Sequence, residues 1–436
     1  MNVCVIGTGY VGLVTGACFA EFGVSVICAD KDAAKVDALQ RGRIPIYEPG
    51  LEALVARNVE QGRLSFTTDT ADAVRSSLVL FIAVQTPTLD GGGTDLSSIE
   101  AVAREIGRAL NGYKVVVTKS TVPVGTTQRV KQWIREELEA AGRDETFAVA
   151  SNPEFLREGA AIGDFMRPDR VVIGAEDDAS RAILRDLYRP LFLNETPFVM
   201  TNVATSELTK YAANAFLATK ISFINEFANL CETVGGDVQA LARGIGLDGR
   251  IGKKFLHAGP GFGGSCFPKD TRAAAHFARA HGGSLEIVEA TVRVNDRQRA
   301  RMIEKVERAV GGSLAGKTIC LLGLSFKPET DDVRDAPSID IARGLVARGA
   351  AVRAFDPVAM RAAEPHLPDV TLCKDAYQAC EGADAAVIVT EWNQFRMLDL
   401  ARVRLALRQP VMVDLRNVYE PEALRKAGFE YISVGR

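Results

Sequence analysis

The stretch Val3-Cys4-Val5-Ile6-Gly7-Thr8-Gly9-Tyr10-Val11-Gly12 decides the fold of the first part of the chain. A short apolar run, typical of a buried strand, ends at Gly7, and a helical pattern follows. In such a pattern the first glycine permits a tight turn, the second lets backbone approach a pyrophosphate, and the third lets helix and strand pack closely. The stretch therefore predicts a strand–turn–helix unit that holds a dinucleotide at the positive end of the helix.

The acidic residue Asp30 follows the second predicted strand, residues 24–29. A carboxylate at this point of a dinucleotide-binding unit binds the ribose hydroxyls and repels a 2′-phosphate, so we expect NAD rather than NADP. The neighbouring Lys31 could soften this preference. The alternative is a turn aspartate without a ligand.

Short β-branched runs alternate with helical patterns in two parts of the chain. The expected strands are residues 3–6, 24–29, 78–83, 114–118 and 147–150, and then 317–322, 351–355, 385–390 and 411–414. This alternation predicts parallel sheets covered by helices.

The middle of the chain changes character, because residues 202–234 contain no glycine or proline. We expect one helix of roughly 45–50 Å there, at 1.5 Å per residue, with two shorter helices as the alternative. The predicted fold is α/β: two Rossmann-like doubly wound domains joined by a helical region with a long central helix. Its domains are a NAD-binding domain (1–200), a central helical dimerisation domain (201–310) and a C-terminal α/β domain (311–436).

Composition restricts the possible partners. The chain has 436 residues and a net charge of −3, whereas a protein that neutralises many nucleic-acid phosphates would be more basic. No apolar run approaches the roughly 20 residues that span a bilayer. The eight cysteines form no C-x-x-C pair, and the four histidines have no metal-ligand spacing. We expect a cytoplasmic protein with no metal, nucleic acid or membrane partner.

One cysteine stands out from the other seven. Cys266 follows a glycine-rich run, Gly259-Pro260-Gly261-Phe262-Gly263-Gly264-Ser265, and precedes Lys269 and a helical pattern at 271–280. A thiol at a helix N-terminus beside a lysine should have a depressed pKa and act as a nucleophile. An inert loop thiol is the alternative. Five other cysteines lie in apolar strands or helices and are expected to be small buried hydrophobes: Cys4, Cys18, Cys28, Cys231 and Cys320.

Several ordered segments carry a family resemblance. They are Lys-Ser-Thr-Val-Pro-Val-Gly-Thr at 119–126, Asn-Pro-Glu-Phe-Leu-Arg-Glu-Gly at 152–159, Glu-Leu-Thr-Lys-Tyr-Ala-Ala-Asn at 207–214, the cysteine run to Asp270, and Gly-Leu-Ser-Phe-Lys-Pro-Glu-Thr-Asp-Asp at 323–332. Together with the opening glycines, they make the whole chain resemble the UDP-glucose/GDP-mannose dehydrogenase family. The run 261–270 looks closer to members that act on UDP-glucose than to those acting on GDP-mannose or UDP-N-acetyl sugars.

The resemblance implies a four-electron oxidation of UDP-glucose to UDP-glucuronate with two NAD per turnover. Cys266 would capture the intermediate aldehyde as a thiohemiacetal, which becomes a thioester and is then hydrolysed. Lys210 and Asn214, four apart on a predicted helix, would stabilise the oxyanion at C6, or Lys210 would be the base. The remaining polar cluster, expected to position or activate water, is Glu158, Thr121 and Asp270. Glu154, four residues before Glu158, is also expected in the catalytic site, and a surface salt bridge is the alternative for either glutamate.

Further binding residues are implied by the same resemblance. Those expected to bind the cofactor are Gly7, Gly9, Tyr10, Val11, Gly12, Asp30, Lys35, Thr86, Thr121, Glu158, Lys269 and Arg334. Those expected to bind the substrate are Glu154, Phe155, Leu156, Glu158, Lys210, Asn214, Arg250, Phe255, Leu256, His257, Ala258, Gly259, Gly263 and Lys327. Arg250 would reach across the interface of a homodimer, which the long helix could build; an exposed loop charge is the alternative.

Two other classes compete with this interpretation. Two-electron hydroxyacid dehydrogenases related to 6-phosphogluconate dehydrogenase also join a dinucleotide-binding domain to helices, but they lack a nucleophilic cysteine and a second α/β domain. A non-catalytic nucleotide-sugar sensor could keep the fold, although the presence of Cys266, Lys210, Asn214 and Glu158 argues against it.

Overall fold

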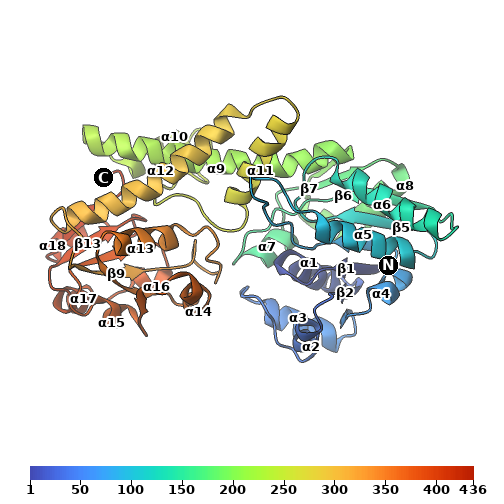
Figure 1. Cartoon of the computed structure of the whole chain (residues 1–436), viewed down its shortest axis with the longest axis horizontal. Helices are drawn as coiled ribbons and strands as arrows, with labels where there is room; N and C mark the ends of the chain where they lie inside the picture. Colours follow the sequence, from blue (N-terminus) through green and yellow to red (C-terminus); the bar gives the residue numbers. More distant parts are fainter. The chain divides into compact units, whose positions relative to one another are not determined.

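The computed structural model describes residues 1–436 and divides into two compact units, Met1–Ala213 and Asn214–Arg436. Each unit contains one twisted sheet with helices on both faces (Figure 1). None of the helices combines the length and the apolar character that crossing a bilayer requires.

The first unit is built on an eight-stranded sheet with the order β3-β2-β1-β4-β5-β6-β7-β8. Its strands are β1 (Asn2–Ile6), β2 (Ser25–Ala29), β3 (Leu64–Thr67), β4 (Val79–Ile82), β5 (Lys114–Thr118), β6 (Phe147–Ser151), β7 (Val171–Ala175) and β8 (Phe198–Thr201). All neighbours run parallel except β6 and β7. The first six strands follow the order 3-2-1-4-5-6, which is the Rossmann arrangement and confirms the predicted fold of this unit.

Alternate residues of these strands pack on opposite faces, as strand geometry requires. Val3 and Val5 of β1 face one group of helices, and Cys4 and Ile6 face the other. The first group comprises α1 (Tyr10–Glu21), α2 (Ala33–Gln40), α3 (Leu51–Glu60), α7 (Ala161–Met166) and α8 (Asp178–Leu187). The second comprises α4 (Thr70–Ser76), α5 (Ser97–Ala109) and α6 (Thr126–Ala140). Both faces are therefore buried, which explains the nearly continuous apolar runs of the strands.

The long helix α9 spans Val203–Val234 (Figure 1), so the single 32-residue helix is confirmed and the two-helix alternative is wrong. Within the first unit, α9 is tied to the start of α6 by the buried carboxylate of Glu207. This carboxylate accepts hydrogen bonds from the backbone N–H groups of Gly125 (2.7 Å) and Thr127 (2.8 Å) and from the Thr127 hydroxyl (2.7 Å). An acid at a helix N-terminus satisfies donors that the helix leaves open.

The second unit repeats the sheet order of the first. Its six parallel strands run β11-β10-β9-β12-β13-β14: β9 (Thr318–Leu322), β10 (Ala351–Phe355), β11 (Val370–Leu372), β12 (Ala385–Ile388), β13 (Val411–Asp414) and β14 (Glu430–Ser433). Its helices are α10 (Val238–Gly246), α11 (Phe267–Ala280), α12 (Glu286–Ala309), α13 (Pro337–Ala347), α14 (Met360–Ala363), α15 (Ala376–Cys380), α16 (Asn393–Arg396), α17 (Leu400–Ala406) and α18 (Pro421–Lys426), and η2 (Glu364–His366) is a 3₁₀ turn. The other 3₁₀ turn, η1 (Arg189–Asn194), belongs to the first unit. Two doubly wound α/β sheets are thus present, as predicted.

The predicted helix after the cysteine run begins earlier than expected. It was expected from residue 271, whereas α11 starts at Phe267 and has Cys266 as its N-cap residue. Pro268 explains the difference, because proline favours the first turn of a helix, where its missing N–H has no partner to lose. The thiol therefore lies at the helix N-terminus itself.

Candidate functional site

The turn after β1, residues 7–12, has the geometry that a dinucleotide needs. Gly7 has φ +100°, and an added Cβ would lie 2.7 Å from the Ala83 carbonyl oxygen. A Cβ on Gly12 would lie 1.9 Å from the Gly7 carbonyl oxygen, so neither position admits a side chain. At Gly9, by contrast, no atom lies within 4 Å of an added Cβ. That open space beside the N-terminus of α1 fits a pyrophosphate.

Asp30 lies directly after β2 and points back at this turn. Its Oδ2 accepts hydrogen bonds from the Thr8 N–H (2.8 Å) and hydroxyl (2.7 Å), and Lys35 Nζ lies 3.2 Å away. Burial alone would raise the pKa of the Asp30 carboxyl, but the bonds from Thr8, Asp32 and Lys35 lower it below its ordinary value. A carboxylate held ionised here can accept ribose hydroxyls and repel a phosphate.

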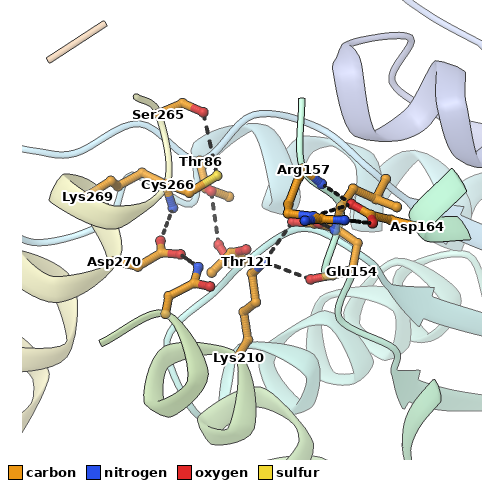
Figure 2. Close-up of polar contacts among 12 residues, drawn as sticks. Thr86, Thr121, Glu154, Arg157, Asp164, Lys210, Ser265, Cys266, Lys269 and Asp270 are labelled. Atoms are coloured by element: carbon orange, nitrogen blue, oxygen red, sulfur yellow. Dashed lines mark hydrogen bonds and ion pairs between the residues drawn. The ribbon is translucent and has the colours of Figure 1, made fainter. Parts of the chain in front are cut away.

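Lys210 on α9 and Glu154 after β6 form a buried ion pair in the first unit (Figure 2). Lys210 Nζ donates to Glu154 Oε1 (3.0 Å) and to the Glu154 carbonyl oxygen (2.7 Å). Burial would raise the pKa of the Glu154 carboxyl, but Lys210 and the Leu156 N–H (2.6 Å) lower it. The surface salt bridge, which was the alternative for Glu154, is therefore wrong. Removing one partner of a buried ion pair destabilises the fold, because the remaining charge is then left without a counter-charge and without water.

A second buried lysine, Lys119 after β5, lies close to this pair. Its Nζ donates to Asn152 Oδ1 (3.0 Å) and to the Tyr188 hydroxyl (3.1 Å), and it lies over the rings of Tyr188 and Phe165. Burial lowers the pKa of Lys119 to about 7, an effect that Glu154 opposes and Lys210 reinforces. The motif around Lys119 was part of the resemblance, but no role for its side chain was predicted.

The remaining predicted residues of the first unit lie on segments that follow strands. Thr86, after β4, donates from its hydroxyl to the Thr121 carbonyl oxygen (2.9 Å), which ties two of these segments together. Glu158 is half-buried and lies in the segment before α7. Its neighbour Arg157 pairs with Asp164 (2.6 Å) (Figure 2).

In the second unit, Cys266 lies among polar groups at the start of α11. Asp270 is buried; its carboxylate accepts hydrogen bonds from Lys269 Nζ (2.7 Å) and Asn214 Nδ2 (2.6 Å), and its N–H donates to the Cys266 carbonyl oxygen (2.8 Å) (Figure 2). The Ser265 hydroxyl lies 3.6 Å from the thiol sulfur.

The other cysteines differ from Cys266 in exposure. Cys266 is half-buried, and all seven others are buried. Burial raises the pKa of the thiols of Cys18 and Cys28 to about 12, and it raises the pKa of Cys4 and Cys320 as well. They fit the prediction of small buried hydrophobes, because a thiol held protonated is a poor nucleophile.

The backbone before Cys266 is held by side chains of α9 and α12. Asn225 accepts from the Gly259 N–H (2.8 Å), and Gln298 donates to the Gly259 carbonyl oxygen (2.9 Å). Asn295 alone makes both kinds of contact with Phe262: its Oδ1 accepts from the Phe262 N–H (2.8 Å), and its Nδ2 donates to the Phe262 carbonyl oxygen (3.0 Å). Gly263 approaches so closely that an added Cβ would lie 2.4 Å from the Asp335 carbonyl oxygen. No pattern in the sequence marks these amide residues, because they lie in ordinary helical patterns.

A cavity of about 340 Å³ adjoins this loop in the second unit. Its lining includes Leu256, His257 and Ala258 of the predicted substrate loop and four basic side chains, Arg243, Lys253, His257 and Arg416, but no carboxylate residue. A basic, concave site suits an anionic ligand such as a diphosphate. Phe255, at the start of the loop, has φ +66°, a conformation that non-glycine residues rarely adopt.

Three predicted basic residues lie on loops of the second unit. Arg250 makes a two-pronged bond to Asp248 (3.0 and 2.6 Å), and its side chain is 90% exposed. Arg334 pairs in the same way with Asp332 (2.8 Å for both bonds). Lys327 is half-buried, with its Nζ over the Phe326 ring. The functional roles of these residues stay predictions.

Comparison with known proteins gives three consecutive matches to one family. Residues 1–192 match the NAD binding domain of the UDP-glucose/GDP-mannose dehydrogenase family, residues 204–297 its central domain, and residues 320–421 its UDP binding domain. UDP-glucose 6-dehydrogenase of Rhizobium meliloti is 55% identical over 439 residues, covering 100% of both chains, and the TuaD enzyme of Bacillus subtilis, also a UDP-glucose 6-dehydrogenase, is 49% identical, covering 100% of this chain and 93% of that one.

The fold has a close counterpart among solved structures. A UDP-glucose dehydrogenase from Pyrobaculum islandicum superimposes with a TM-score of 0.91 at 41% identity, covering 99% of this chain and 96% of the other. The likeness includes the second sheet, which the class of two-electron hydroxyacid dehydrogenases lacks.

The contacts of Asp30 predict that replacing it changes cofactor choice. Asp30→Asn removes the charge that repels a 2′-phosphate, so we expect the ratio of kcat/KM for NAD over NADP to fall about tenfold or more, equivalent to ~1.4 kcal/mol. Steady-state kinetics with both cofactors measures this ratio. Asp32→Asn, in the N-cap of α2, is the matched control and should leave it unchanged. An unchanged ratio in Asp30→Asn would contradict the assignment.

The low pKa of Lys119 predicts a pH-dependent stability. Between about 7, its pKa in the folded unit, and its ordinary value of 10.5, the unfolded chain binds more protons, so this group adds stability as the pH rises. Lys119→Met lacks that contribution. Its free energy of unfolding, taken relative to the wild-type value at the same pH, should therefore fall by up to about 2–3 kcal/mol between pH 7 and pH 9. Urea unfolding at both pH values measures the difference. The exposed Lys31→Met should show no such trend, and a pH-independent difference for Lys119→Met would refute the argument.

Proposed function

The chain belongs to the UDP-glucose/GDP-mannose dehydrogenase family and is an NAD-dependent oxidoreductase, and on this premise we propose that it oxidises the C6 alcohol of UDP-glucose to the carboxylate of UDP-glucuronate. The observation that carries the proposal is the placement of Cys266. It is the one cysteine that is not buried, and it caps a helix beside Lys269 and Asp270. A two-electron dehydrogenase would need no such thiol, because its product is not captured covalently.

The first oxidation converts the C6 alcohol to an aldehyde. Lys210 and Asn214 lie one turn apart on α9, and we assign them to the negative charge that develops on the C6 oxygen. Lys210 Nζ lies 3.0 Å from Glu154 Oε1, and this buried contact fixes the lysine at a place where a cation can stabilise that charge. Bound NAD, held by residues 7–12 and Asp30, supplies the oxidising power, since each of two NAD molecules accepts one hydride.

The second oxidation runs through the thiol. The Cys266 thiol adds to the aldehyde: its sulfur forms a bond to the aldehyde carbon, and its proton passes to the carbonyl oxygen, which becomes the hydroxyl of a thiohemiacetal. Loss of a second hydride and of the hydroxyl proton leaves a thioester. Water then attacks, the carbon–sulfur bond breaks, and the carboxylate leaves while the thiol is restored. Glu158 takes the proton from that water, and Thr121 and Asp270 position it.

The substrate is a nucleotide sugar held by the second unit. The basic cavity beside residues 255–259 suits the diphosphate of the substrate. We assign Lys327 and Gly263 to binding the sugar. Relatives that align over the full chain act on UDP-glucose by name, which favours this sugar over GDP-mannose. Phe155 and Leu156, next to the Lys210–Glu154 pair, would border the sugar through their backbone.

We further propose a homodimer formed through α9. Exposed apolar residues repeat along one stripe of this helix: Phe216, Phe223, Phe227, Leu230 and Val234. From Phe223 onward their spacing of four, three and four residues is that of a helix face that packs on another helix. A second copy offers the same stripe, so the contact can be symmetric. Arg250, exposed on its loop, would reach the partner's substrate.

Glu158→Gln tests the hydrolysis step. Without a base the thioester should persist, so we expect turnover to fall about 10²–10⁴-fold while the first NADH still forms at its normal rate. Intact-mass spectrometry after incubation with UDP-glucose and NAD would show the covalent adduct, and Cys266→Ser in the same background should abolish it. If no adduct accumulates although the first NADH forms, the base lies elsewhere.

The dimer predicts a specific response to charge on α9. Phe223→Asp combined with Phe227→Asp should give a monomer, because the apolar contact would then bury four carboxylates, two from each subunit, at a cost of several kcal/mol in total. Light scattering after size exclusion measures the mass. Met397→Asp, also an exposed apolar residue replaced by aspartate, is the control and should leave the dimer intact. A monomeric wild-type protein would contradict the proposal.

A further inference from the structure

Glu48 is a buried carboxylate for which the proposed mechanism has no use. It lies in the connection between α2 and α3, in a stretch without helix or strand, and its side chain is 7% exposed. Buried acids of this kind are uncommon unless they are fully hydrogen-bonded. Its partners therefore show what it does.

All the donors to Glu48 come from two functional segments of the first unit. Its Oε2 accepts from the Gly159 N–H (2.6 Å) and from the Tyr10 hydroxyl, and its Oε1 accepts from the Ala161 N–H (2.8 Å). The Gly159 N–H also lies 3.2 Å from the Tyr10 hydroxyl oxygen. Tyr10 opens α1 within the turn 7–12, and residues 159–161 follow Glu158 directly. One carboxylate thus joins the cofactor turn to the segment that carries the proposed base.

The same segment is fixed on its other side. The Arg157 N–H donates to Asp164 Oδ2 (2.8 Å), and the Arg157 side chain pairs with Asp164 (2.6 Å). Gly159 has φ +76°, the left-handed conformation that glycine adopts without strain. Glu158 stands between these two anchors, so its backbone position depends on both.

The Tyr10 hydroxyl must be protonated to donate its hydrogen bond to Glu48. Burial, the hydrogen bond to Glu48 and the charges of Glu48 and Glu158 all raise the pKa of the Tyr10 hydroxyl far above its ordinary value, while the Gly159 N–H opposes them. The phenol therefore stays protonated and keeps donating to the carboxylate.

We propose that Glu48, together with Tyr10, is a positioning residue that holds Glu158 in place for thioester hydrolysis. This inference rests on the proposed function, because it assumes that Glu158 is the base. The contacts join protein to protein, so they do not depend on a bound cofactor. The base segment therefore keeps its place while one cofactor molecule leaves and another enters, which a turnover with two hydride transfers requires.

The test compares Glu48→Gln and Tyr10→Phe with Glu158→Gln. Glu48→Gln keeps the size of the side chain but turns one accepting oxygen into a donating amide, and Tyr10→Phe leaves the two backbone bonds of Glu48 intact. We expect Glu48→Gln to form the first NADH within about twofold of the wild-type rate, and both variants to turn over about tenfold or more slowly and to accumulate the thioester in the intact mass. Glu52→Gln, exposed on α3, is the matched control and should do none of this.

The possible outcomes distinguish the role proposed for Glu48 from the role proposed for Glu158. An adduct in Glu158→Gln but in neither Glu48→Gln nor Tyr10→Phe overturns the role of Glu48 and leaves the proposed function standing. The same holds if these variants only raise the KM for NAD, because the pair would then serve the cofactor turn alone. No adduct in Glu158→Gln overturns the base assignment and the Glu48 proposal with it. Because Tyr10→Phe removes only one hydroxyl, it tests the idea even if Glu48→Gln fails to fold.

Discussion

The ends of parallel strands are the constraint on which the arrangement of the chain depends. In a parallel sheet every strand has its carboxyl end at the same edge, so segments far apart in sequence meet there. Gly7, Asp30, Thr121 and Glu154 follow β1, β2, β5 and β6 of the first sheet. The second sheet repeats the same strand order, and its acid after β10 is Asp356. That carboxylate accepts from the backbone N–H groups of Leu324 (2.7 Å) and Ser325 (3.0 Å), as Asp30 accepts from the Thr8 N–H (2.8 Å) in the first sheet.

Buried charged groups lie at that edge of the first sheet, where burial makes them costly for stability. A buried ion pair such as Lys210–Glu154 is rarely more stable than a well-packed apolar pair of the same size. Lys119 is more costly still, because its direct partners, Asn152 and Tyr188, are neutral. Such groups persist in a domain core when a reaction needs preorganised charge, since fixed dipoles and ions stabilise a developing charge without reorganisation. In the second unit, the buried Asp270 between Lys269 and Asn214 follows the same logic.

The sequence predicted those features that local patterns dictate. The glycine turn, Asp30, the long helix and Cys266 were all visible, because glycine spacing, apolar periodicity and composition are local properties. The family resemblance and NAD as cofactor are confirmed by the full-length matches. Five strands were missed: β3, β7, β8, β11 and β14. Four of them mix polar with apolar residues, whereas β7 is apolar throughout and no polar residue explains why it was missed. The start of α11 was placed four residues late because the effect of Pro268 was not weighed.

Contacts across long sequence distances could not be predicted from local patterns. Glu48 reaches Gly159 over 111 positions, and Asn225 reaches Gly259 over 34. No periodicity marks an acid or an amide that will accept from a distant backbone group. The burial of the Lys210–Glu154 pair was equally hidden, because it depends on how α9 packs beside β6 rather than on either segment alone.

The central claim is that one chain carries out two oxidations of the same carbon through Cys266. The most direct measurement is the number of NADH molecules formed per UDP-glucose consumed, with excess NAD and limiting sugar. The account predicts two NADH per sugar for the wild-type protein and the loss of that stoichiometry in Cys266→Ser. One NADH per sugar, or two that persist without the thiol, would contradict it.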